Sequence, residues 1–147
     1  DADAIAALEA SRRTDDTAGE RAALIQALRA RQGGSDAARR EAGAALVEMA
    51  RRGMGYAANA IPLLCRLGRF EEALDVARAL YLGQGPVRID RTVQFIGSRR
   101  FPPHGEASPD VLFHPFVAPL RRAGRLDAVF AGIGLTDFWR TAGGPDA

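Results

Sequence analysis

Proline divides the chain into two parts of different character. None of its eight prolines precedes Pro62, and seven of them lie at Pro86 or later. Proline interrupts a helix interior because it lacks the backbone N–H and its ring collides with the preceding turn. The first part is also rich in alanine, leucine and arginine, which favour helices. We therefore expect about five helices before residue 84.

Start and stop signals divide this first part further. The first helix is expected near Ala2–Arg12. The second begins at residues 17–20, Thr-Ala-Gly-Glu, a capping-box pattern in which the hydroxyl and the carboxylate satisfy free N–H groups. The glycine pair at 33–34 ends that helix, and Ser35 or Asp36 caps the third. The pattern indicates consecutive helices joined by short turns.

The length and composition exclude several protein classes. A chain of 147 residues suits one domain or a short repeat array, because single domains cluster at about 100–150 residues. With 47% hydrophobic and 26% charged residues it is neither disordered nor collagen-like. No apolar run approaches the ~20 residues that cross a bilayer, so we expect no membrane insertion. A lone cysteine, Cys65, excludes an internal disulfide framework and a multi-cysteine zinc site.

One segment resembles a known repeat. Residues 67–73, Leu-Gly-Arg-Phe-Glu-Glu-Ala, resemble the turn between the two helices of a tetratricopeptide repeat. In that unit of about 34 residues a glycine permits the turn, an aromatic side chain packs between the helices, and a small residue lets them touch. Gly68, Phe70 and Ala73 occupy these places. The resemblance implies helical hairpins stacked into a right-handed superhelix, with first-helix residues facing a groove.

The end of the chain carries a second resemblance. Residues 113–116 (Phe-His-Pro-Phe), 119–121 (Pro-Leu-Arg), 134–135 (Gly-Leu) and 138–139 (Phe-Trp), followed by Pro145-Asp146, resemble the closing segment of bacterial tetratricopeptide-like proteins. In that family the segment often follows a winged-helix DNA-binding domain or a cyclase-like catalytic domain. The resemblance implies a terminal cap on the array and a sensory or interaction region of a regulator.

Glycine also marks a boundary inside this closing segment. Gly134 is expected to take the left-handed conformation that ends one helix, and Leu135 to make the hydrophobic contact after it. Thr136 or Asp137 would then cap the next helix.

These observations predict one all-α domain over residues 1–147. Residues 1–85 would form the hairpins, 86–112 an irregular stretch rich in proline and glycine, and 113–147 the C-terminal helices and a short capping helix. Seven of the ten aromatic residues follow Pro86. We expect them to fill grooves in the alanine-rich stack, because a long irregular segment needs a surface to lie on. The chain begins without an initiator methionine or a leader, so we interpret it as part of a longer protein. The sequence does not determine its compartment: the cytoplasm is favoured, and the periplasm is the alternative if the chain is fused to a transmembrane regulator.

No group of residues has a spacing that predicts catalysis or metal binding. His104 and His114 are ten positions apart, which fits no standard zinc motif. Ser98 and Ser108 lack the Gly-x-Ser-x-Gly elbow of serine hydrolases. Cys65 lies in mid-helix among leucines, where a thiol is usually a buried hydrophobe. We therefore predict no enzyme activity, no catalytic residue, no cofactor and no metal.

The arginines suggest nucleic-acid binding and are explained more simply. All 20 basic residues are arginine and the pI is about 9.3, yet the net charge is only +2. Three of five arginine pairs fall in the last turn of an expected helix, where a cation complements the helix macrodipole. We therefore expect no direct nucleic-acid contact within this fragment. The pairs begin at Arg12, Arg39, Arg51, Arg99 and Arg121.

The function that this pattern favours is a non-catalytic module that binds a protein segment, within a bacterial regulatory or scaffold protein. Asn59 would bond the backbone of the bound peptide, and Arg66 a carboxylate. A first alternative is a sensor domain that encloses a small molecule, with Phe95, Phe101 and Phe113 lining the pocket. A second is a structural element that forms a homodimer. The peptide-binding module predicts an open groove, the sensor domain a closed apolar cavity, and the homodimer an apolar patch related by two-fold symmetry.

Overall fold

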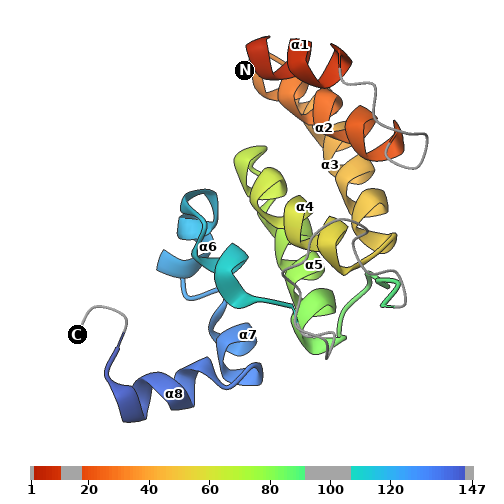
Figure 1. Cartoon of the computed structure of the whole chain (residues 1–147). Helices are drawn as coiled ribbons and strands as arrows, with labels where there is room; N and C mark the ends of the chain where they lie inside the picture. The colour runs from red at the N-terminus through yellow and green to blue at the C-terminus, as the bar shows by residue number, and fades with distance from the viewer. Residues whose placement is uncertain (1, 11–17, 92–106, 145–147) are drawn as a thin grey trace.

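The protein is an all-helical molecule in the residues that its structure, a computed structural model, describes: 2–10, 18–91 and 107–144 (Figure 1). No strand occurs in these ranges, which confirms the predicted all-α class. Helices α1 and α8 lie at opposite ends of the molecule (Figure 1). The α-helices are α1 (Ala2–Ala10), α2 (Ala18–Arg31), α3 (Asp36–Arg51), α4 (Met54–Arg66), α5 (Phe70–Leu82), α6 (Ala118–Arg122), α7 (Asp127–Gly132) and α8 (Leu135–Ala142), with two 3-10 helices, η2 (Pro109–Phe113) and η3 (Pro115–Val117).

Local capping sets the helix ends in the first part. The Ser35 hydroxyl accepts the N–H of Ala38 at 3.2 Å, so the predicted cap of α3 is confirmed for Ser35. Gly68 has a φ of +73°, which allows the turn between α4 and α5 that the repeat pattern predicts. Thr17, the other predicted cap, lies outside the described residues.

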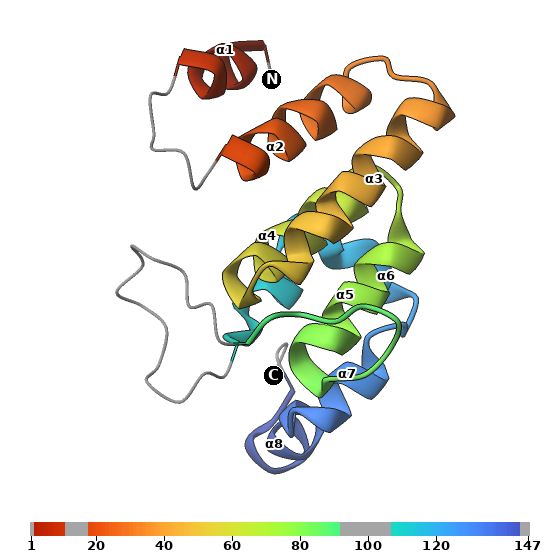
Figure 2. The ribbon, with the colours of Figure 1, turned by 90° about the vertical axis from the view of Figure 1, so that its right-hand side faces the viewer.

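Helices α2 to α5 form two consecutive hairpins, α2–α3 and α4–α5, that pack side by side (Figure 2). Helix α3 contacts both α2 and α4, and α1 packs on α2. The interfaces are built largely from alanine, whose short side chain lets helix axes approach closely. Six of these alanines are fully buried: Ala42, Ala50, Ala57, Ala60, Ala73 and Ala77.

The segment after α5 returns along the hairpins and closes two helix ends. The N–H of Asp90 donates to the carbonyl of Arg51 at the end of α3 (2.9 Å). The guanidinium of Arg91 donates to the carbonyls of Ala79 and Leu80 near the end of α5 (3.2 and 2.8 Å). Val87, which precedes Asp90 and Arg91 in the chain, is buried. These bonds supply hydrogen-bond donors to carbonyl groups in the last turns of α3 and α5.

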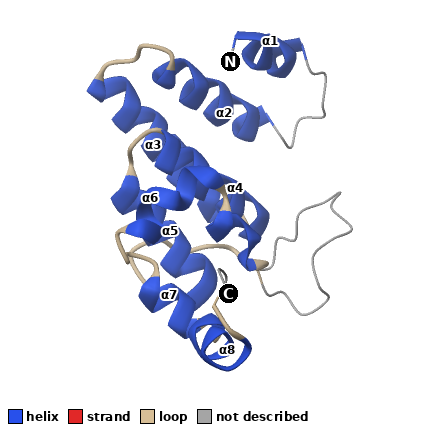
Figure 3. Ribbon diagram, turned by 90° about the vertical axis from the view of Figure 1, so that its left-hand side faces the viewer, coloured by secondary structure: helices blue, strands red, loops and turns tan. Residues whose placement is uncertain are grey.

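The C-terminal part packs onto the hairpins rather than forming a separate body (Figure 3). The 3-10 helices η2 and η3 contact α4, and α7 contacts α5. Leu112 and Val117 are fully buried, and they belong to the same buried cluster as the core of α2–α5. One hydrophobic core therefore includes residues from both sides of the irregular stretch.

Helix α8 begins earlier than predicted. Gly134 has a φ of +77° and directly precedes the helix, which starts at Leu135 without a side-chain cap. Thr136 and Asp137 therefore lie inside the first turn, and their prediction as caps is wrong. The physical reason is that the left-handed glycine both ends the turn after α7 and sets the direction of α8, so no residue is left between them.

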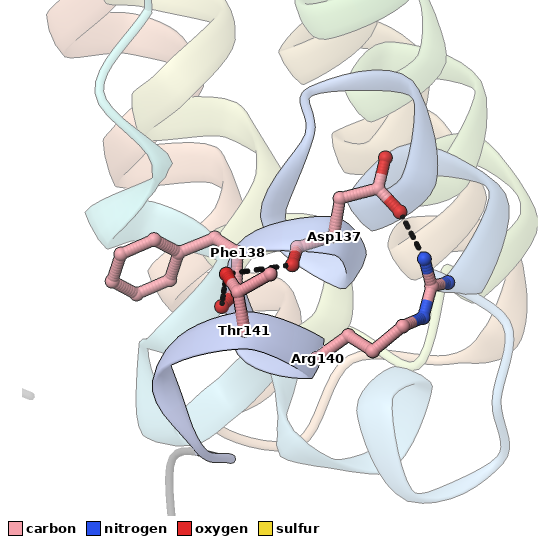
Figure 4. A network of polar contacts seen from close by, with 4 residues as sticks. All are labelled: Asp137, Phe138, Arg140 and Thr141. Carbon is pink, nitrogen blue, oxygen red and sulfur yellow. Dashed lines mark hydrogen bonds and ion pairs between the residues drawn. The ribbon is translucent and has the colours of Figure 1, made fainter.

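Polar contacts within α8 stay on the helix itself (Figure 4). The guanidinium of Arg140 donates to the carboxylate of Asp137 (2.7 Å), and the Thr141 hydroxyl lies within hydrogen-bonding distance of the Asp137 and Phe138 carbonyls. The Phe138 ring extends away from these groups and is 59% exposed. Within the described ranges, no helix combines the length and the apolar character that a membrane span needs.

Candidate functional site

The two residues predicted to bind a partner lie on one face of α4. Asn59 and Arg66 are seven positions apart, and Leu63 lies between them, so all three project from the same side of the helix. Asn59 is exposed, whereas Leu63 and Arg66 are half-buried. An amide, an alkyl group and a guanidinium group therefore follow one another along this side of α4.

Helix α2 adds a second row beside it. A shallow crease of about 10 Å³ lies between α2 and α4, and Arg31 and Arg66 both line it. Leu28 and Leu63 contribute apolar surface to the same crease. We call the surface formed by Leu28, Arg31, Asn59, Leu63 and Arg66 the α2/α4 face. It combines half-buried leucines with two cations from neighbouring helices.

The Arg66 side chain is oriented by an aromatic ring from the C-terminal part. Its guanidinium lies 4.6 Å from the centroid of the Phe116 ring, a cation–π contact. Phe116 is 39% exposed, although the adjacent Val117 is fully buried. The backbone N–H of Phe116 donates to Nδ1 of His114 at 3.2 Å. Phe116 therefore extends the α2/α4 face beyond α2 and α4.

Sequence reasoning did not identify Phe116 as a neighbour of Arg66. The two residues are 50 positions apart, and no pattern in the sequence pairs them. The one available signal was the Pro-Phe pair in the closing segment, which carried the family resemblance without indicating a contact.

Arg121 fixes the segment that presents Phe116. Its guanidinium donates to the carbonyls of Leu112 and His114 at 2.7 and 3.2 Å. The same group lies 5.7 Å from the centroid of the Phe113 ring. Two backbone carbonyls outside any α-helix are thereby satisfied by one side chain.

Phe113, the described member of the predicted sensor pocket, belongs to an aromatic cluster. Its ring is stacked on Phe130 at 5.9 Å between centroids, and Trp139 lies edge-on to both rings at 6.1 and 5.3 Å. Phe95 and Phe101 lie outside the described residues, so the pocket that the sensor alternative requires stays a prediction. The dimer alternative also stays a prediction, with Phe138 as the most exposed large apolar side chain described.

Several other titratable or polar groups are buried or have structural partners. Burial raises the pKa of the Cys65 thiol from 9.0 to about 11, so it is a poor nucleophile at neutral pH. Glu71 accepts a hydrogen bond from Arg125 at 2.7 Å, which lowers the pKa of that carboxyl, and Glu72 pairs with Arg69. The Ser108 hydroxyl accepts the N–H of Asp110, as a helix cap does. Across residues 2–10, 18–91 and 107–144, no three potential metal ligands cluster.

Comparisons with protein-family models, curated proteins and solved structures give no match for this chain. The candidate site is therefore defined by its own geometry, and the α2/α4 face is the place where residues from two helices and the C-terminal segment converge.

Proposed function

We propose that the chain is a non-catalytic, tetratricopeptide-like interaction module of a bacterial regulatory or scaffold protein, and that its α2/α4 face binds an acidic segment of a partner protein. In this proposal the hairpins form a right-handed stack, and α2 and α4 are the first helices of consecutive units. The observation that carries the proposal is the placement of Arg31 and Arg66 on one crease beside half-buried Leu28 and Leu63.

The chemistry of this face matches an acidic, partly apolar ligand. A guanidinium group binds a carboxylate through two parallel N–H···O bonds, and such charge-assisted bonds are stronger than neutral ones. The leucine surface offers a place for an apolar side chain of the ligand. The exposed amide of Asn59 can both donate to and accept from the backbone of an extended peptide.

Phe116 contributes by limiting the motion of Arg66. A free arginine side chain loses about 2 kcal/mol of rotamer entropy when it is fixed. Because the ring already holds the guanidinium at 4.6 Å, part of this loss has occurred before the ligand arrives. Pre-organisation of this kind raises affinity without adding a contact.

The test is binding of a short fluorescein-labelled peptide in which Glu and Leu alternate, measured by fluorescence polarisation at about 150 mM salt, where exposed charges are screened beyond about 8 Å. Losing a hydrogen bond to a charged group costs about 1.5–3 kcal/mol, so Arg66→Gln should weaken binding about tenfold to a hundredfold. Arg31→Gln should weaken it similarly.

Arg140→Gln is the matched control, because Arg140 is an exposed arginine of α8 whose partner is Asp137 on its own helix. It should bind the peptide as the wild type does. The proposal is refuted if the wild-type chain does not bind this peptide, or if all three arginine variants bind it equally well.

A further inference from the structure

A second concave surface is lined by residues of α1, α2 and α3. It is a cleft of about 490 Å³, far larger than the crease on the α2/α4 face. Small side chains, among them Ala30 and Ala38, line its inner part and leave space between the helices unfilled, and Ala22 is an exposed member of the lining. Ile25, which is half-buried, adds the largest apolar side chain of the lining.

This cleft and the α2/α4 face lie on opposite sides of α2. Successive helix residues are rotated by about 100°, so Gln26 in the cleft and Leu28 in the crease point about 160° apart. Ala22 in the cleft and Arg31 in the crease differ by about 180°. A ligand in one site therefore leaves the other site accessible.

The charge of the cleft is opposite to that of the α2/α4 face. Glu9 and Arg29 form an ion pair across it at 2.6 Å, which neutralises the one cation of the lining. Glu41 is exposed on α3 and forms no ion pair with a described residue. The lining thus carries a net negative charge above an apolar floor.

From this arrangement we propose that the α1–α3 cleft is a docking site for a basic segment of a partner protein. Apolar side chains of that segment would lie on the floor of the cleft, and one of its arginine or lysine side chains would pair with Glu41. A net negative lining selects a cationic ligand, and an arginine pairs with a carboxylate in bidentate geometry. Several lining residues, including Glu9, Ala22 and Arg29, are exposed, so the cleft receives side chains from an adjacent segment rather than enclosing a small molecule.

Two peptides that differ only in charge test the proposal on the full chain. The first is a fluorescein-labelled peptide in which Arg and Leu alternate. The second carries Glu in place of every Arg and is the Glu–Leu peptide used to test the proposed function. The Arg peptide should bind the wild-type chain, and Glu41→Gln should weaken this binding about tenfold, because one charge-assisted contact is lost. Ala22→Leu, a substitution between two good helix formers at an exposed position, should fill the cleft and reduce binding at least as much.

Glu48→Gln is the matched control, since Glu48 is on the same helix, its side chain is 72% exposed and it is outside the cleft lining. It should leave binding of the Arg peptide unchanged. The proposal is overturned if the Arg peptide does not bind, if Glu48→Gln weakens binding as much as Glu41→Gln, or if Ala22→Leu has no effect on a chain with wild-type helicity.

The same variants separate this proposal from the proposed function. Arg66→Gln should weaken binding of the Glu peptide and leave the Arg peptide unaffected, whereas Glu41→Gln should do the reverse. If only one of these two losses is observed, only the corresponding site is supported, because the sites lie on opposite sides of α2.

Discussion

Removing the Leu112 side chain tests whether the C-terminal segment and the hairpins share one core. Leu112 is fully buried in η2, which contacts α4, although it follows α5 by 30 residues in the sequence. The Leu112 carbonyl, which accepts the bond from Arg121, is retained in Leu112→Ala. The substitution therefore deletes apolar packing and leaves the hydrogen bond in place.

The expected loss follows from burial. Truncating a buried leucine to alanine costs about 2.7–5 kcal/mol, the lost transfer free energy plus the cost of the cavity that remains. We expect Leu112→Ala to lower the free energy of unfolding by about 3 kcal/mol, near the low end of this range. The site adjoins the half-exposed Phe113, so neighbouring side chains can partly fill the cavity. For a chain of 147 residues this corresponds to a decrease in Tm of about 6–12 °C.

The single tryptophan makes the assay specific. Trp139 packs against Phe113 and Phe130, so its fluorescence reports on the C-terminal part, whereas far-UV circular dichroism is dominated by the longer helices α1–α5. Urea unfolding followed by both signals should give coincident transitions, both shifted by Leu112→Ala. Phe138→Ala is the control: it deletes a larger but 59% exposed side chain and should shift neither transition by more than about 0.5 kcal/mol.

Two results would refute this reasoning. In the first, Leu112→Ala shifts the fluorescence transition but not the dichroism transition, which would mean that the C-terminal part unfolds as a separate unit. In the second, Leu112→Ala lowers the free energy of unfolding no more than Phe138→Ala does, which would mean that Leu112 does not contribute to the core.

Two further outcomes follow from single residues. Because burial raises the pKa of Cys65 from 9.0 to about 11, the unfolded chain releases the thiol proton first as the pH rises, so stability should fall between pH 9 and pH 11. The loss is at most about 3 kcal/mol, and Cys65→Ala should show a smaller decrease in urea midpoint over this range; equal decreases would contradict the assignment. Gly68→Ala should destabilise the chain by about 1 kcal/mol in thermal unfolding, because a φ of +73° is strained for alanine. The cost should not exceed this backbone strain, since no atom lies near enough to clash with an added Cβ. Gly68→Asn should cost less, and an unchanged Tm in Gly68→Ala would contradict the conformational argument.

The features that were predictable from the sequence depend on residues close together in the chain. The Ser35 cap acts on Ala38, three positions away, and the turn at Gly68 depends on the conformation of one residue. Such local signals place the ends of α3, α4 and α5 without knowledge of the tertiary structure. The incorrect caps at Thr136 and Asp137 failed because a turn with one left-handed glycine needs no further residue.

The contacts that define the candidate site were not predictable, because they join distant parts of the chain. Arg66 was identified on α4 from the repeat resemblance, but its partner Phe116 comes from a 3-10 helix beyond the irregular stretch. The bond from Arg125 to Glu71 likewise joins residues 54 positions apart. The charge of the α1–α3 cleft depends on where α1 lies on α2, which composition and periodicity do not determine.

The bonds made by Asp90 and Arg91 have a mechanical consequence. They tie the C-terminal ends of α3 and α5, which are the second helices of consecutive hairpins. When two packed hairpins tilt relative to each other, bonds along one edge hold that edge in place, so the hairpins bend about it. We therefore expect the spacing of α3 and α5 to stay nearly constant while α2 and α4 separate or approach. We expect the stiffness of helices α2–α5 to be lowest on the side that carries the α2/α4 face.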